Sequence, residues 1–281
     1  MIMKKILSLC AVAALAFAAC GTSPDAAADA LYKQADAAYT AGDYQSAKIY
    51  IDSIRATYPT VLPVRRKAIE LMRSVELAEQ QRTLDYCNET LAHLEARRDS
   101  LLPAFELERA DRYQDEGSYI IPSQALRVNV YNSLLRARVT ESGKAFITSL
   151  YRGKRIAHSS VRVSAGGSYA ECDKAFMSHT FRNLGVNNER LDFLRGEDGG
   201  IMDFISHATT DITVELRGEQ GTHKYTLRSS DAAAVARVVE LSRVLQAIAE
   251  YRNMAAEASR HITFVQKSRE RFSRDSISIA E

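Results

Sequence analysis

Apolar residues recur at a helical period near both ends of the chain. In residues 30–60 this spacing is interrupted at Gly42 and Asp43, which predicts a hairpin of two short helices. Residues 64–102 contain no Gly or Pro, and Pro103 follows them. We therefore expect one long helix that Pro103 ends. We assign residues 61–116 to this long-helix segment, in which the acidic stretch 106–116 is a solvated helix end capped by Gly117.

A second long helix is predicted for residues 229–272, leaving a tail at 273–281. In both long helices apolar positions alternate in steps of three and four, which is the spacing of a helix-packing seam. The seam positions are Leu84, Cys87, Leu91, Leu94, Arg98, Leu101 and Phe105, and Leu241, Val244, Ile248, Tyr251, Ala255, Ala258, Ile262 and Val265. An antiparallel pair of these helices is the expected arrangement, and packing of both on a β layer is the alternative.

The intervening region, residues 117–228, changes to a period of two and is rich in Thr, Val, Tyr and Ile. The clearest predicted strands are residues 145–151, 155–164, and a hairpin of 211–217 with 223–228, and a short helix is predicted over 201–207. The sequence therefore predicts an α+β fold: an N-terminal helical hairpin, then a long antiparallel helical pair of coiled-coil type with a β-rich domain inserted between its helices.

The first 19 residues have the features of an export signal. Lys4 and Lys5 precede fourteen apolar or small residues, 6–19, that end before Cys20. Fourteen helical residues span about 21 Å, which is short of the ~30 Å hydrocarbon core of a bilayer. We therefore expect this segment to be removed, which excludes a permanent transmembrane anchor here.

The junction Phe17-Ala18-Ala19-Cys20 resembles the lipobox of Gram-negative bacterial envelope lipoproteins. The resemblance implies lipid attachment at Cys20 and, because Gly21 and not Asp follows, sorting to the outer membrane. An ordinary cleavage site with an incidental cysteine is the alternative. Residues 20–29 are small and polar, and we expect them to form a flexible tether.

The predicted N-terminal hairpin is similar to a single tetratricopeptide repeat. Small, turn, aromatic and terminating residues occupy the positions that this repeat requires: Ala35, Gly42, Tyr44, Ala47, Ile51, Ile54 and Pro59. Leu31 stands where the repeat usually has Trp, and no second clear copy follows. The alternative is a helical hairpin that caps the longer helix, since one repeat cannot form a groove.

The charge balance argues against nucleic acid as a partner. Removing Lys4 and Lys5 from the 37 basic residues leaves 35, against 35 acidic residues, and the two signs are well mixed. The chain has no Trp, which lowers the expectation of a sugar-stacking platform. With Cys10 removed and Cys20 acylated, only Cys87 and Cys172 remain as thiols. A bond between them is an alternative to our expectation that Cys87 is a small apolar seam residue.

We predict no catalytic, cofactor-binding or metal-binding residue. The six histidines lack metal-ligand spacing. His158, Ser159, Ser160 and Asp173 are residue types of a nucleophilic triad, but no nucleophile elbow surrounds the serines, and we interpret them as polar decoration of a sheet.

The acidic stretch 106–116 lacks the Gly-anchored loop of a calcium site. Tyr113 lies within this stretch, and Tyr119, Ile120 and Ile121 follow it; these four are either core residues or a partner surface. We interpret them as core residues.

These expectations favour binding over catalysis. The predicted architecture is similar to envelope lipoproteins that join a coiled coil to a small β domain, including periplasmic adaptor-like proteins. We predict a structural or interaction module with a protein partner, held at the membrane by its lipid. A ligand- or glycan-binding protein that uses the β-rich domain is the first alternative, and an envelope hydrolase is the second.

Overall fold

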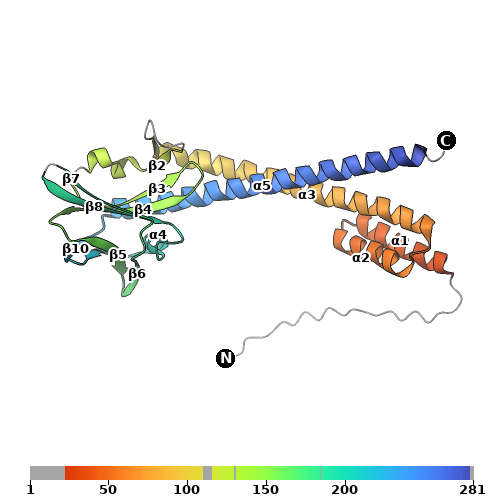
Figure 1. Ribbon diagram of the computed structural model, residues 1–281, viewed down its shortest axis with the longest axis horizontal. Helices are drawn as coiled ribbons and strands as arrows, with labels where there is room; N and C mark the ends of the chain where they lie inside the picture. Colours follow the sequence, from red (N-terminus) through yellow and green to blue (C-terminus); the bar gives the residue numbers. More distant parts are fainter. Residues whose placement is uncertain (1–22, 110–115, 130, 184, 279–281) are drawn as a thin grey trace, which may run out of the picture. The chain divides into compact units, whose positions relative to one another are not determined.

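The protein is mixed α+β in a computed structural model that describes residues 23–109, 116–129, 131–183 and 185–278 (Figure 1). The helices are α1 (Pro24–Thr40), α2 (Tyr44–Thr57), α3 (Leu62–Leu101), α4 (Ile201–His207) and α5 (Ser229–Ser278), with short 3-10 turns at Leu102–Ala104, Pro122–Gln124 and Leu126–Val128. The strands are β1 (Glu106–Glu108), β2 (Ser118–Ile120), β3 (Leu134–Thr140), β4 (Ala145–Gly153), β5 (His158–Ala165), β6 (Ser168–Cys172), β7 (Met177–Asn183), β8 (Val186–Leu194), β9 (Thr213–Gly218) and β10 (Gly221–Thr226).

The chain divides into two compact units, one of residues 1–82 with 259–281 and one of residues 83–258. In the first unit the predicted hairpin is confirmed, with α1 and α2 joined at Gly42. The prediction of a flexible tether was wrong for residues 24–29, which are helical, and residues 20–22 lie outside the described residues. The hydroxyl of Ser23 accepts a hydrogen bond from the Ala26 N–H (3.3 Å), and Pro24 occupies a first-turn position that suits proline.

In the second unit, the seam positions within residues 83–101 and 229–258 are buried or half-buried, and Cys87 is fully buried. Three contacts join the helices: Arg97 with Glu240, Glu95 with Arg252 (2.5 Å), and the ring of Tyr86 with that of Tyr251. The prediction that the first long helix reaches residue 116 was wrong. It ends at Leu101 before Pro103, and Glu106–Glu108 forms β1 because its backbone pairs with β2.

Two antiparallel sheets form the β-rich region, with strand orders β1-β2-β3-β4-β8-β7 and β10-β9-β5-β6. Figure 1 draws β3, β4 and β8 in one layer and β5, β6 and β10 in the other. The core between them is apolar and includes Val139, Ile147, Phe193, Val161 and Leu216. The strands predicted over 145–151, 155–164 and the hairpin over 211–228 are all present, within a few residues of the expected bounds.

The core also holds α4 and the first turns of α5, which supply Ile201, Met202, Val235, Val238 and Leu241. The predicted interpretation of Ile120 as a core residue is confirmed, since it is fully buried. Ile121 and Tyr119 are half-buried, and Tyr113 lies outside the described residues.

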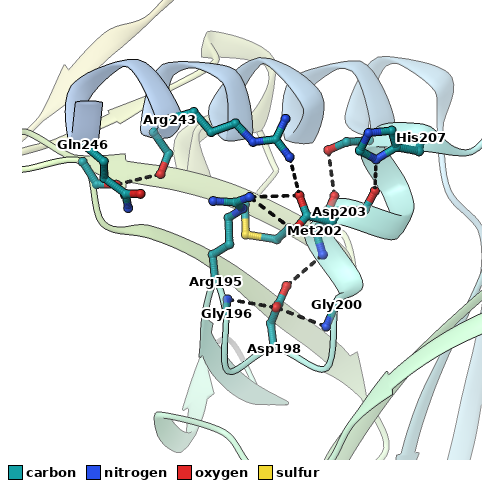
Figure 2. Close-up of polar contacts among 12 residues, drawn as sticks. Arg195, Gly196, Asp198, Gly200, Met202, Asp203, His207, Arg243 and Gln246 are labelled. Atoms are coloured by element: carbon teal, nitrogen blue, oxygen red, sulfur yellow. Dashed lines mark hydrogen bonds and ion pairs between the residues drawn. The ribbon is translucent and has the colours of Figure 1, made fainter. Parts of the chain in front are cut away.

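The loop between β8 and α4 is fixed by a buried carboxylate (Figure 2). Asp198 accepts hydrogen bonds from the N–H groups of Gly196 (3.2 Å), Gly200 (3.3 Å) and Met202 (2.8 Å). Gly199 in this loop has φ +62°, and a Cβ there would lie 2.1 Å from the Glu171 carbonyl oxygen, so only glycine fits. The helix predicted over residues 201–207 starts directly after this loop.

Two arginines then attach α4 to its neighbours. Arg195, after β8, and Arg243, on α5, converge on Asp203 of α4 at 3.0 and 2.9 Å (Figure 2). Burial acts to raise the pKa of Asp203, but the two guanidinium groups outweigh it and hold that pKa below its usual value. The end of β8 is therefore tied to both helices.

We expect Asp198→Ala to lower the free energy of unfolding by about 2 kcal/mol, because three N–H groups, of which that of Met202 is buried, lose a charged acceptor. Asp198→Asn keeps one acceptor oxygen and should lose less. Urea unfolding followed by circular dichroism measures both. An Ala variant as stable as the parent would contradict this account of the loop.

Candidate functional site

The six-stranded sheet has a second face, opposite the core, that carries arginines. Because side chains alternate along a strand, Leu135, Ala137 and Val139 of β3 enter the core while Arg136 and Arg138 point to the other side. The pairing register of β3, β4 and β8 shows which residues of the neighbouring strands share this face. Arg136 lies opposite Thr148 of β4, and Leu150 of β4 lies opposite Arg190 of β8.

Two adjoining cavities of about 230 and 530 Å³ lie on this face and share Leu126, Arg136 and Arg190 in their walls. Five arginines contribute to the two cavities, and we call this surface the arginine groove: Arg109, Arg136, Arg138, Arg152 and Arg190. Glu108 is the only carboxylate among the lining residues. Leu134, Leu150 and Phe181 line the smaller cavity, so that cavity combines apolar walls with cationic groups.

One wall of the groove is built by the 3-10 turns between β2 and β3. Gln124, which is fully buried, donates from Nε2 to the Leu135 carbonyl (3.2 Å) and accepts from the Ala137 N–H (2.9 Å). Its amide thus pairs with β3 as a neighbouring strand would. Asn129, also buried, closes the turns by donating to the carbonyls of Ser123 (2.9 Å) and Ala125 (3.0 Å).

Arg136 lies at the centre of the groove and is only 3% exposed. One guanidinium nitrogen, Nη2, forms an ion pair with Glu108. Its Nε is buried and has no hydrogen-bond partner among the residues that the structure describes. A buried N–H donor without an acceptor is costly, so a ligand oxygen that reached this nitrogen would stabilise the guanidinium.

Arg138 is the second unusual cation. It is half-buried, lies 4.1 Å over the Phe146 ring, and donates to the Ser118 hydroxyl at 3.4 Å. Burial lowers the pKa of its guanidinium, and repulsion from Arg190 and Arg136 acts in the same direction, whereas Asp192 and Glu108 act to raise that pKa. Within the described ranges no carboxylate lies within ion-pair distance of it, so a bound anion would relieve this repulsion.

The other arginines are oriented by neighbours on their own face. Arg190 makes a two-pronged contact with Asp192, at 2.9 and 3.1 Å. Arg152 donates to Asn188 at 3.5 Å and lies 5.3 Å from the centre of the Tyr131 ring. Guanidinium groups held in this way present several N–H donors in fixed directions, which suits carboxylate or other oxygen-rich anions.

Among the described residues, no hydrogen bond joins His158 to Ser159 or to Asp173. His158 is buried, and its Nε2 lies 3.3 Å from Ser149 Oγ, a serine that sequence reasoning did not single out. Ser159 is exposed and contacts the Arg217 carbonyl, and Asp173 is exposed after β6. His158 and Ser160 are polar residues of a strand, as interpreted from the sequence, but both are buried because this face of β5 points into the protein.

Glu189 organises the segment before His158. Its buried carboxylate accepts hydrogen bonds from the N–H groups of Ile156 (2.9 Å), Ala157 (3.3 Å) and His158 (2.5 Å). This arrangement links β8 of one sheet to the start of β5 in the other. Burial lowers the pKa of His158 to about 4, even though Glu189 acts to raise it. His158 is therefore neutral near pH 7.

Cys87 and Cys172 are both buried free thiols, which does not support a bond between them. Cys20, the predicted lipid attachment residue, lies outside the described residues. None of the helices in the described part of the chain is long and apolar enough to cross a bilayer. No cluster of three potential metal ligands occurs in residues 23–109, 116–129, 131–183 and 185–278.

Sequence reasoning missed the arginine groove entirely. The signal was present in the alternation Leu134-Leu135-Arg136-Ala137-Arg138, where two arginines two residues apart must share one face of a strand. Its joining with Arg190 depends on the β3-β4-β8 order, which the sequence pattern does not provide. Comparison of the chain with models of protein families, with curated proteins and with solved structures found no match.

We predict that His158 makes stability fall with acid. Its folded pKa of about 4 lies below the ordinary 6.5, so the unfolded chain binds a proton more readily and stability is lost as pH falls from about 6.5 to 4. The loss is ~3 kcal/mol across that window. Denaturant unfolding of the parent and His158→Gln at several pH values measures the difference, and parallel pH curves would contradict the assignment.

Proposed function

We propose that this chain is a lipid-anchored binding protein of the Gram-negative cell envelope, attached to the outer membrane through Cys20. The support is the order of features at the N-terminus: Lys4 and Lys5, the apolar stretch 6–19, and the lipobox-like junction before Cys20. Acylation at this cysteine would leave the mature chain, from residue 20 onward, outside the cytoplasm.

The architecture that we propose is an antiparallel pair of helices of coiled-coil type, with a β-rich domain inserted between the two helices. Within the second unit, contacts from Tyr86 to Tyr251 and from Arg97 to Glu240 run in opposite directions along α3 and α5. The buried Cys87, Leu241 and Ile248 lie at seam positions of the two helices. This arrangement supports a role in presenting the β-rich domain.

The function that we propose is binding of an anionic, carboxylate-bearing ligand in the arginine groove. The observation that carries it concerns Arg136, which lines both cavities. Its buried Nε has no hydrogen-bond acceptor among the described residues. Arg138 and Arg190 supply further positive charge beside it, and apolar walls provide the desolvated surface in which charged hydrogen bonds are strong. The groove therefore favours ligand binding by the β-rich domain over catalysis.

A protein-docking role for the helical unit is the second candidate. A cavity of about 230 Å³ between α2 and α3 is lined by Ile51, Ile54 and Met72 together with charged residues. Ile69, at its wall, is 42% exposed. An apolar recess with a charged rim is the usual form of a protein contact, as an adaptor-like protein would require.

Binding of propane-1,2,3-tricarboxylate to the full chain in detergent micelles tests the proposed groove. We expect calorimetric titration to detect binding that weakens with added salt, and Arg138→Met to weaken it about tenfold through loss of one charged contact. Because Arg138 has no ion-pair partner within the described ranges, its replacement leaves no carboxylate unpaired and should keep the unfolding free energy near that of the parent.

Arg237→Met is the matched control, since Arg237 is an exposed arginine on α5 in the same unit. It should bind the tricarboxylate as the parent does. Equal weakening by both substitutions would indicate a nonspecific charge effect and would refute the groove. So would the absence of detectable binding to the parent.

The anchor has a separate test. In Gram-negative cells fed an alkyne-bearing fatty acid, the parent chain should become labelled and fractionate with outer membranes. Cys20→Ala should lose the label and leave the membrane fraction, because it lacks the thiol that receives the lipid. Cys10→Ala is the control, and it should retain both. A labelled Cys20→Ala chain would show that the attachment residue is wrong.

A further inference from the structure

Strand β7 forms a free edge of the six-stranded sheet. It pairs with β8 through seven residues, from Met177 to Asn183, and is the last strand in the sheet order. No other strand of the described residues pairs with it, and every one of its seven residues is exposed. Alternate N–H and C=O groups of such a strand point away from the sheet and are open to pairing with another strand.

The edge lacks the features that usually prevent such pairing. Its sequence, Met-Ser-His-Thr-Phe-Arg-Asn, contains no proline, lysine or carboxylate. Arg182 is its only permanent charge. The exposed side chains at and beside the edge include Phe176 (61% exposed), Met177 (55%) and Phe181 (39%). Long edges with exposed apolar residues and little charge are the ones that recruit a further strand.

The edge also borders the arginine groove. Phe181 and Asn183 line the smaller cavity, and the register sets His179 opposite Arg190 and Phe181 opposite Asn188. Residues directly opposite one another share a face, so His179 and Phe181 lie on the groove side of β7. The two rings stack with centres 5.5 Å apart. A strand added outside β7 would direct every second side chain to this same face.

We propose, on the basis of the groove function above, that the ligand is an extended acidic peptide that adds to β7 as a new edge strand. Strands lie about 4.8 Å apart, so the new strand runs about 10 Å from β8. A glutamate on its groove side and the long Arg190 side chain together span that distance. The peptide backbone forms hydrogen bonds with the outward N–H and C=O groups of β7, and the peptide carboxylates neutralise the positive charge of the arginine groove.

Charge and backbone chemistry select this occupant. An acidic polysaccharide offers carboxylates but no row of N–H donors for the edge. A second copy of this chain offers an edge, but β7 has no carboxylate to place near Arg190. A partner segment of about seven residues, alternating acidic with β-branched residues, provides both.

The probe is a fluorescein-labelled heptapeptide that alternates glutamate with valine, titrated into the full chain in micelles and followed by fluorescence anisotropy. N-methylation of one set of alternate amides should weaken binding at least tenfold, because those N–H groups face β7. N-methylation of the other set should have little effect. Replacing glutamate by glutamine should weaken binding by a similar factor.

Hydrogen exchange provides the complementary readout on the protein. Peptide binding should slow exchange at alternate amides of residues 177–183 and leave those of the β5-β6 sheet unchanged. Protection of β7 in a concentration-dependent way without peptide would overturn the proposal in favour of a second copy. Equal binding by both N-methylated peptides would overturn strand addition.

The outcomes distinguish this inference from the groove function. If tricarboxylate binds and Arg138→Met weakens it, while the heptapeptide fails to bind, the groove stands and the peptide inference is wrong. If the glutamine peptide and the glutamate peptide bind equally and tricarboxylate does not bind, the proposal of an anion-binding groove is also wrong.

Discussion

The alternation of side chains along β3, β4 and β8 is the constraint on which the rest of the structure depends. One face of these strands must supply Val139, Ile147 and Phe193 to the core, and burial of that set fixes the pairing register. Once the register is fixed, Arg136 and Arg190 must both lie on the opposite face of the sheet. A slip of one residue would send these guanidinium groups into the core, so packing on one side determines the charge on the other.

The parts of the fold that sequence predicted are those with local causes. Pro103 ends α3, Gly42 separates α1 from α2, and the glycine-containing loop before Ile201 starts α4. In each case a residue and its immediate neighbours carry the information. The seam residues were also predictable, because a spacing of three and four residues has one physical meaning over this many turns.

The features that the sequence did not predict depend on strand partners that are distant along the chain. Glu106 and its neighbours looked like a helix end because acidic residues and a following glycine are typical of one, yet pairing with β2 makes them a strand. His158 alternates with Ser159 as surface residues do, yet Glu189 from another sheet draws its backbone inward. Both errors have the same origin, since local propensity is weaker than a long-range hydrogen-bond partner.

The amide of Gln124 has a consequence for how this sheet can associate. It occupies the hydrogen-bonding positions of β3 beyond the short β2, and the strand at that end, β1, has only three residues. The six-stranded sheet therefore has one full-length open edge and one blunted edge. Lateral growth through a single edge stops at a closed pair, whereas two open edges permit an endless fibre. A sheet that can be extended at one edge only combines an edge open to strand addition with protection against polymerisation.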